Sequence, residues 1–194
     1  MSKFRVEIAG APGVPMLTHN ERLANRFDEY TKAMAAITSK RTKTDEDVLE
    51  LARLEFLGGL YLTDDGHVGV PTWNIYRTIQ EGAKINRKGK MIERGVQMLG
   101  ADVIPITHDG PATPRAMWEA GCFDQRSVKV GTSKVTRTRP RFANWKITFD
   151  CITQPDVLDD DSFKMAIENA GLMTGLGDYR PRFGRFELMS LEVL

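Results

Sequence analysis

The sequence lacks the features that define several large classes of protein. Its two cysteines, Cys122 and Cys151, form no CxxC pair and are too few for a disulfide framework. No stretch approaches the ~18 consecutive apolar residues of a membrane-spanning helix. Charged residues occur between Met1 and Glu7, where a signal peptide would need an apolar core. We therefore expect a cytoplasmic protein in a reducing compartment, without membrane association.

Residue patterns of metal centres and catalytic sites are also missing. The three histidines lie far apart and follow no metal-ligand spacing. The sequence contains no GxSxG, Walker A or HExxH motif. Gly175 and Gly177 lack the third glycine and the preceding strand of a dinucleotide-binding motif, and Asp159–Asp161 suits the start of a helix. We expect no cofactor and no metal site.

The size and composition are those of an ordinary globular protein. The chain has 194 residues, of which 41% are hydrophobic and 27% charged. A chain of this length is expected to fold as a single domain and to bury roughly 70% of its unfolded surface. No internal repeat, low-complexity tract or long linker divides it. We therefore predict one domain over residues 1–194.

The charge is distributed unevenly along the chain. The formal net charge is only +1, yet the segment from Arg126 to Lys146 has seven basic residues and no acidic one. Such segregation creates a local positive potential even when the total charge is small. The segment therefore favours contact with a polyanion, and the alternative is a solvated basic hairpin. Its basic residues are Arg126, Lys129, Lys134, Arg137, Arg139, Arg141 and Lys146.

A second distinctive segment runs from Gly175 to Phe186. It holds three glycines, three arginines and three aromatic residues within twelve positions. Glycine allows the backbone to approach a ligand closely, and arginine binds phosphate and stacks on planar rings. The pattern favours binding of a polyanion with flat bases, and the alternative is a glycine-rich turn that leads into an edge strand. Asp178 is interpreted as an orienting partner of Arg180 or Arg182.

Hydrophobic periodicity predicts a mixed α+β fold. The predicted order of strand, helix, strand, strand, helix and strand is compatible with a ferredoxin-like (RRM-like) core with an antiparallel sheet. Residues 20–56 are predicted to form a helical insertion after the first strand. The patterns predict strands over 3–9, 57–62, 68–71, 101–107, 126–137, 142–152 and 186–193, and helices over 20–38, 44–55, 72–88 and 159–171.

Three segments resemble the RAMP superfamily of CRISPR-associated proteins, in particular the backbone subunits that coat guide RNA. These segments are Val70–Arg77, the glycine-rich stretch Gly175–Phe186, and the opening strand with Met16–Asn20 after it. Arg137–Pro140 and the glycine-rich stretch also resemble a set of phage-borne proteins, from which no activity can be transferred. The resemblance implies a protein that oligomerises along RNA or DNA, alone or in a CRISPR-type complex, and that lies in the host cell cytoplasm if it is phage-encoded.

We therefore expect a non-enzymatic protein that binds single-stranded nucleic acid. Because loop arginines and an exposed tyrosine bury little apolar area, their replacement is expected to leave folding intact. Stacking on aromatic side chains contributes roughly 1–3 kcal/mol per base in such complexes. The expected phosphate contacts are Arg137, Arg139, Arg141, Arg180, Arg182 and Arg185, with Lys84, Lys88 and Lys90 at the groove edge. The expected close backbone approaches are at Gly175, Gly177 and Gly184, and the expected stacking residues are Tyr179 and Phe183.

Two other functions are compatible with the sequence. One is a phage structural or interaction protein, either a virion assembly component or a mimic of a CRISPR-complex subunit. In that case the arginines would lie at subunit interfaces or pair with the acidic segment 156–178, building rings or filaments without nucleic acid. The other is a metal-independent endoribonuclease that uses His19 or His108 as a base.

Overall fold

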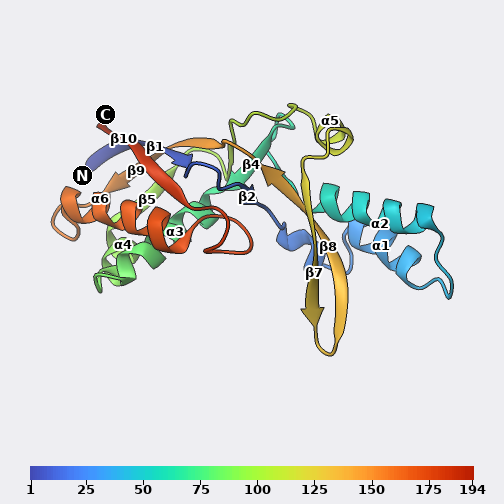
Figure 1. The fold of residues 1–194 in the computed structure, drawn as a ribbon. Helices are drawn as coiled ribbons and strands as arrows, with labels where there is room; N and C mark the ends of the chain where they lie inside the picture. The colour runs from blue at the N-terminus through green and yellow to red at the C-terminus, as the bar shows by residue number, and fades with distance from the viewer.

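The computed structural model describes the backbone of residues 1–194 and every side chain except those of Val130 and Ser133. The fold is mixed α+β. Figure 1 shows a sheet with helices packed on it beside a long hairpin that is accompanied by two further helices. The main sheet is antiparallel, with its strands in the order β10 (Phe186–Val193), β1 (Ser2–Gly10), β9 (Lys146–Thr153) and β5 (Val96–Leu99).

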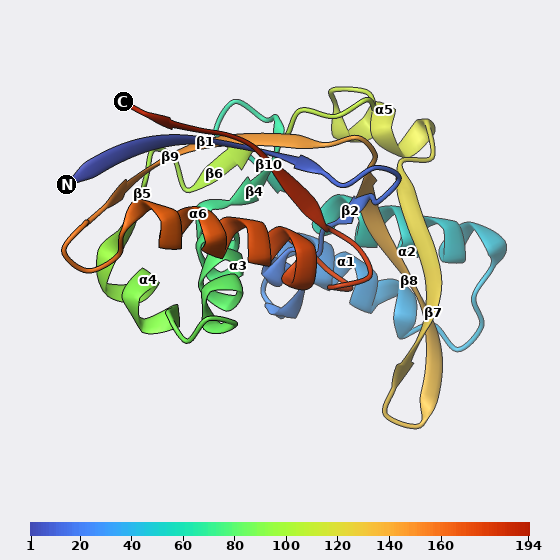
Figure 2. The ribbon, with the colours of Figure 1, turned by 60° about the vertical axis from the view of Figure 1, so that its left-hand side comes forward.

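Helices cover one face of this sheet, as Figure 2 shows. Alternate residues of β1 point toward them, because Phe4, Val6 and Ile8 are almost completely buried while Lys3 and Arg5 are exposed. This alternation is the one that the sequence predicted over residues 3–9. The covering elements are α3 (Thr72–Lys84), α4 (Gly89–Gly95), α6 (Asp160–Asn169) and the π-helical turn η2 (Ala170–Thr174).

Gly82 allows α3 and α6 to pack closely. A Cβ atom at Gly82 would lie 2.3 Å from the carbonyl oxygen of Ala166 and 2.5 Å from the backbone nitrogen of Ala170. Both neighbours are backbone atoms, which cannot move aside as the end of a flexible side chain can. The spacing between the two helices, and therefore their packing on the sheet, depends on the absence of a side chain here.

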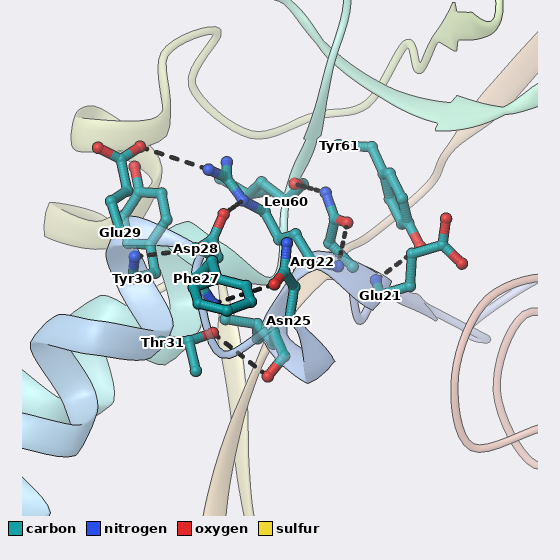
Figure 3. Close-up of polar contacts among 12 residues, drawn as sticks. Glu21, Arg22, Asn25, Phe27, Asp28, Glu29, Tyr30, Thr31, Leu60 and Tyr61 are labelled. Atoms are coloured by element: carbon teal, nitrogen blue, oxygen red, sulfur yellow. Dashed lines mark hydrogen bonds and ion pairs between the residues drawn. The ribbon is translucent and has the colours of Figure 1, made fainter.

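The insertion predicted over residues 20–56 consists of η1 (Glu21–Ala24), α1 (Glu29–Thr38) and α2 (Asp45–Gly58). Thr44 and Asp47 form the predicted capping box at the start of α2. Polar contacts fix the corner before α1, as Figure 3 shows: Arg22 Nε donates to Asp28 Oδ2 over 2.7 Å, and the Asn20 side chain donates to the Leu60 carbonyl over 2.8 Å. The first contact fixes the turn within the insertion, and the second attaches its start to the chain segment that follows it.

The rest of the fold consists of short strands and one long hairpin. A three-stranded sheet holds β3 (Tyr61–Leu62), β4 (Val68–Pro71) and β6 (Val103–Pro105). The hairpin strands β7 (Phe123–Val130) and β8 (Ser133–Phe142) pair with each other, and β8 also pairs with β2 (Met16–Leu17). Helix α5 (Pro114–Glu119) lies just before β7, and the hairpin extends beyond the body of the protein in both views.

Several predicted boundaries were wrong. The segment 126–137, predicted as one strand, crosses the hairpin turn, where Gly131 has a φ of 61°. The segment 57–62 is not one strand, because α2 continues to Gly58, and 20–38 divides into η1 and α1. The predicted helix 72–88 ends at Lys84, and both α4 and β5 were missed. Glycine stands at two of these boundaries, Gly59 as the C-cap of α2 and Gly131 in the hairpin turn.

Among the residues that the structure describes, no helix combines the length and apolar character needed to cross a membrane.

We predict that Gly82→Ala destabilises the protein. The added methyl group would overpack the contact between α3 and α6, at a cost of about 1–3 kcal/mol. This cost is expected to exceed the ~1 kcal/mol that alanine gains over glycine in a helix. Urea unfolding of the variant and the wild type measures the difference in the free energy of unfolding.

Gly121→Ala is the control for a substitution without steric overlap, because nothing lies within 4 Å of a Cβ atom added at Gly121, whose φ is 71°. It is expected to cost only the strain of an αL alanine, about 1–2 kcal/mol. A Gly82→Ala protein as stable as the wild type would contradict the close helix packing.

Candidate functional site

One face of the β7–β8 hairpin carries most of its arginines. Asp124 lies opposite Arg139 and Arg126 lies opposite Arg137 in the antiparallel register, so the four side chains share a face. Arg141 follows at the next alternate position of β8. The hairpin therefore presents a row of guanidinium groups, with Asp124 as the carboxylate among them.

The segment 175–185 forms a loop that is tied to the first part of the chain. The Gly184 N–H donates to the Pro15 carbonyl over 3.0 Å, and the Asp178 N–H donates to the Leu17 carbonyl over 2.7 Å. Gly177 has a φ of 88°, and a Cβ there would lie 2.2 Å from the Leu17 oxygen. Its glycines therefore serve close packing of the protein against itself.

This packing corrects the role expected for Gly175, Gly177 and Gly184. They were predicted to let the backbone approach a nucleic acid. Gly175 and Gly184 are buried, and their N–H groups donate to carbonyls of the same chain. The loop backbone at these two glycines is already satisfied by protein acceptors, so ligand contacts of the loop depend on its side chains.

The hairpin and the loop meet at an ion pair between Arg139 and Asp178. Arg139 Nε donates to Asp178 Oδ2 over 2.6 Å, and only 8% of Arg139 is exposed. Arg126 stacks on the same loop, with its Cζ atom 4.6 Å from the ring centroid of Phe183 and 5.2 Å from that of Tyr179. The two segments that the sequence marked separately are thus brought together into one surface.

A buried carboxylate from α2 completes this junction. Glu55 is 5% exposed, and its Oε2 accepts a 2.8 Å hydrogen bond from the Thr138 N–H. Its Oε1 accepts from Arg137 Nη1 over 3.0 Å and lies 3.7 Å from Arg139 Nη1. A buried carboxylate requires such partners, because its charge loses hydration. Sequence reasoning missed Glu55 as a functional position, although the predicted helix 44–55 includes it and Glu55 follows Val48 and Leu51 at helical spacing.

The junction changes the roles expected for four other side chains. The partner of Asp178 is Arg139, rather than Arg180 or Arg182. Arg139 is buried in that pair and is not free for a phosphate. Tyr179 and Phe183 are half-buried, and Arg126 occupies part of their ring surfaces.

Other arginines remain at the surface around this junction. Arg137 keeps 41% of its side chain exposed in spite of its contact with Glu55. A hollow of about 630 Å³ borders the loop, lined in part by Tyr179, Arg180 and Glu81 of α3. Besides Arg137, the arginines of the two segments that remain exposed are Arg141, Arg180, Arg182 and Arg185.

The three predicted lysines do not all lie on one surface. Lys88 hydrogen-bonds the Ser162 hydroxyl and lies 3.7 Å from Asp159, at the start of α6. Lys84 and Lys90 line a second hollow, between α3 and α4. Lys84 also donates to Glu81 over 2.5 Å, and Glu81 borders the hollow beside the loop. Only Lys84 is thereby connected to the loop surface.

The histidines differ in their surroundings. His19 lies beside the junction, where partial burial of the ring and then the charge of Arg139 lower its pKa. The ring of His108 packs edge-on against Phe142, and its Nδ1 accepts from the Gly110 N–H over 2.9 Å. Burial lowers the pKa of His108 as well, so burial favours the neutral form of both rings. His108 has a structural contact, and His19 is the histidine near the arginines.

Within the described part of the chain, no three His, Cys, Asp or Glu side chains are grouped so that they could hold a metal ion. No protein-family model matches the sequence, and no curated protein is significantly similar to it. The resemblance to the RAMP superfamily therefore depends on the motifs quoted above and stays a prediction.

We predict that Arg139→Ala destabilises the protein strongly, in contrast to the expectation from the sequence. Removing this side chain leaves the Asp178 carboxylate without its guanidinium partner. It also removes one of the two guanidinium groups near the Glu55 carboxylate. Loss of one partner of a fully buried ion pair costs about 3–5 kcal/mol, and the 33% exposure of the Asp178 side chain places the expected cost near the lower end of that range. Chemical denaturation monitored by circular dichroism measures the loss in the free energy of unfolding.

Arg185→Ala is the control for this experiment. Arg185 is exposed and makes one hydrogen bond, from its Nε to the Pro181 carbonyl, so its loss is expected to change stability by no more than about 0.5 kcal/mol. Equal stability of the two variants would show that the junction does not hold the hairpin to the loop.

Proposed function

We propose that the protein is a non-enzymatic, single-stranded nucleic-acid-binding protein whose binding surface spans the β7–β8 hairpin and the loop 175–185. The observation that carries this proposal is the junction of Arg139 with Asp178, which joins the two arginine-rich segments. Arginine is suited to this role because its guanidinium forms paired hydrogen bonds with phosphate oxygens. The exposed arginines around the junction are the proposed phosphate contacts.

The proposed core is ferredoxin-like. Its elements in chain order are β1, α3, β5, β9, α6 and β10, which is the strand and helix order of that fold. The sheet order β10-β1-β9-β5 with antiparallel neighbours supports the assignment. The insertion η1–α2, the small sheet and the β7–β8 hairpin would then be additions between the core elements.

Binding is proposed at the hairpin and loop rather than on the open face of the sheet. RRM domains stack bases on aromatic residues of that face. Here the outward residues of β1 and β9 include Arg5 and Asp150, joined by two hydrogen bonds of 2.9 Å, and Glu7 near Lys146. All residues of β1, β5, β9 and β10 are described, and their outward positions hold no aromatic side chain. The open face offers paired charges instead of a stacking surface.

A structural or interaction protein of a phage particle is the competing function. It is favoured by the pair of Arg139 with Asp178, because Asp178 belongs to the acidic segment 156–178. Arg126 and Arg137 also pair with carboxylates, those of Asp124 and Glu55, which lie outside that segment. These pairs neutralise part of the basic segment without any nucleic acid. The exposed arginines of the loop distinguish the two functions, because they have no carboxylate partner among the described side chains.

We predict that Arg182→Ala weakens binding of single-stranded nucleic acid about uniformly across sequences. Each lost phosphate contact is expected to reduce the slope of log affinity against log salt by roughly 0.7 for single strands. Fluorescence anisotropy with labelled oligonucleotides at several salt concentrations measures both effects. Arg115→Ala is the matched control, since Arg115 lies outside the two arginine-rich segments, is 89% exposed on α5, and pairs with Glu119 over 2.9 Å.

Absence of binding at low salt would refute the proposed function. The size-exclusion mass before and after nuclease treatment then tests the competing function. Assemblies that persist unchanged after nuclease treatment would support the structural protein, whereas assemblies that dissociate would support oligomerisation along a strand.

A further inference from the structure

The outward face of α3 carries an exposed aromatic residue in line with basic ones. Trp73 is 63% exposed, an unusual state for the largest apolar side chain. Its ring stacks on Tyr76 with centroids 5.3 Å apart, and Arg77 Cζ lies 5.4 Å from its centroid. Trp73, Arg77 and Lys84 recur at helical spacing and therefore share one face of α3. The tryptophan is held in place by its neighbours and still open to solvent.

Two hollows adjoin this face. One, of about 470 Å³, lies between the Trp73 and Tyr76 rings and the β5 residues Met98 and Leu99. The other, of about 480 Å³, lies between α3 and α4 and is lined by Arg77, Lys84, Arg87 and Lys90. Because α3 borders both, an aromatic hollow is followed along the helix by a basic one. We call the two together the α3–α4 groove.

The basic half of the groove has more positive than negative charge. Its carboxylates are Glu93, which lines it, and Glu81, which lies beside it and accepts from Lys84 over 2.5 Å. Four cations thus face two carboxylates. Arg87 has a φ of 60°, a left-handed conformation that is unfavourable for a residue with a long side chain. The fold places an arginine here, where glycine or asparagine would be less strained.

We propose that the α3–α4 groove binds a short stretch of single-stranded nucleic acid, with one base against Trp73 and the following phosphates along Arg77, Lys84, Arg87 and Lys90. A base supplies the flat apolar group that Trp73 stacks on, and phosphates supply the matching charge. Lys84 follows Trp73 by eleven positions of helix, about 16 Å along the axis, which leaves room for more than one nucleotide. The inference rests on the proposed function for the class of ligand, but places it on a different surface.

The experiment uses tetrathymidylate and the intrinsic tryptophan fluorescence of the full chain. Of the three tryptophans, Trp145 is fully buried, and Trp118 stacks on Phe123 with centroids 4.7 Å apart. Trp118 is half-buried and Trp73 is the most exposed of the three, so the Trp73→Phe variant identifies the share of the quenching that comes from Trp73. The wild type is expected to show saturable quenching that weakens as salt is added.

Substitutions in the groove separate the contribution of the Trp73 ring from that of the positive charges. Trp73→Phe is expected to lose the quenching and to keep the affinity within twofold, measured by anisotropy of a labelled tetrathymidylate, because phenylalanine still offers a ring. Trp73→Ala is expected to weaken binding about tenfold. Lys90→Ala is expected to lower the salt slope by about 0.7. Lys32→Ala is the control, because Lys32 is an exposed lysine on α1, and it is expected to change neither the affinity nor the salt slope.

The outcomes separate this inference from the proposed function. The groove inference alone is wrong under two conditions taken together. Long single strands bind and Arg182→Ala weakens that binding, whereas tetrathymidylate does not quench the tryptophan fluorescence and its affinity does not change in Trp73→Ala. If quenching persists while Arg182→Ala changes nothing, the proposed hairpin and loop surface alone is wrong. Equal binding of a polyglutamate peptide, weakened by the same variants, would overturn the inference in favour of an acidic protein partner.

Discussion

The buried guanidinium of Arg139 is the interaction on which the arrangement of this protein depends. It connects three parts of the chain that are distant in sequence: the hairpin that carries it, Asp178 in the loop and Glu55 in α2. Removing charges from water is costly, and the cost is offset only when the partners are close and well oriented. The contact therefore favours one relative placement of hairpin, loop and insertion, with the aromatic rings beneath Arg126 packed in the same junction.

Some arginines hold the junction together through ion pairs and ring contacts, whereas others remain exposed around it. Arg139 is buried, and Arg126 is held by Asp124 and by the rings of the loop. The basic potential presented to a ligand therefore comes from the exposed arginines of the loop, together with Arg137 and Arg141. A count of positive charges along the sequence overstates that potential, because it does not show which charges are paired. The function proposed for the surface depends on the residual charge.

Much of the fold could be predicted from the sequence, because local patterns determine it. Alternation in β1, the capping box at Thr44 and the acidic start of α6 each depend on residues close in sequence. The mixed α+β class follows from them. The hairpin turn at Gly131 was missed because the residues on both sides of it are equally typical of strands. Gly131 is a local sign of a turn, but a single glycine does not determine where the chain pairs with itself.

The candidate site was predictable only in part, for the same reason. The two arginine-rich segments could be recognised, but the partner of Asp178 could not, since Arg139 is 39 residues away along the chain. Glu55 gave a usable signal: a carboxylate in line with apolar helix positions must find a partner when buried. Trp73 gave none that separates it from a core residue, because only the structure shows that its ring is exposed.

The central claim is that Arg139 and Asp178 hold the hairpin to the loop, and a double-mutant cycle tests it most directly. Arg139→Met, Asp178→Asn and the double variant would be compared with the wild type in the free energy of unfolding. The account predicts a coupling energy of about 1–3 kcal/mol, with the double variant less destabilised than the sum of the single variants. A coupling energy near zero would show that the two side chains act independently, and would contradict the account.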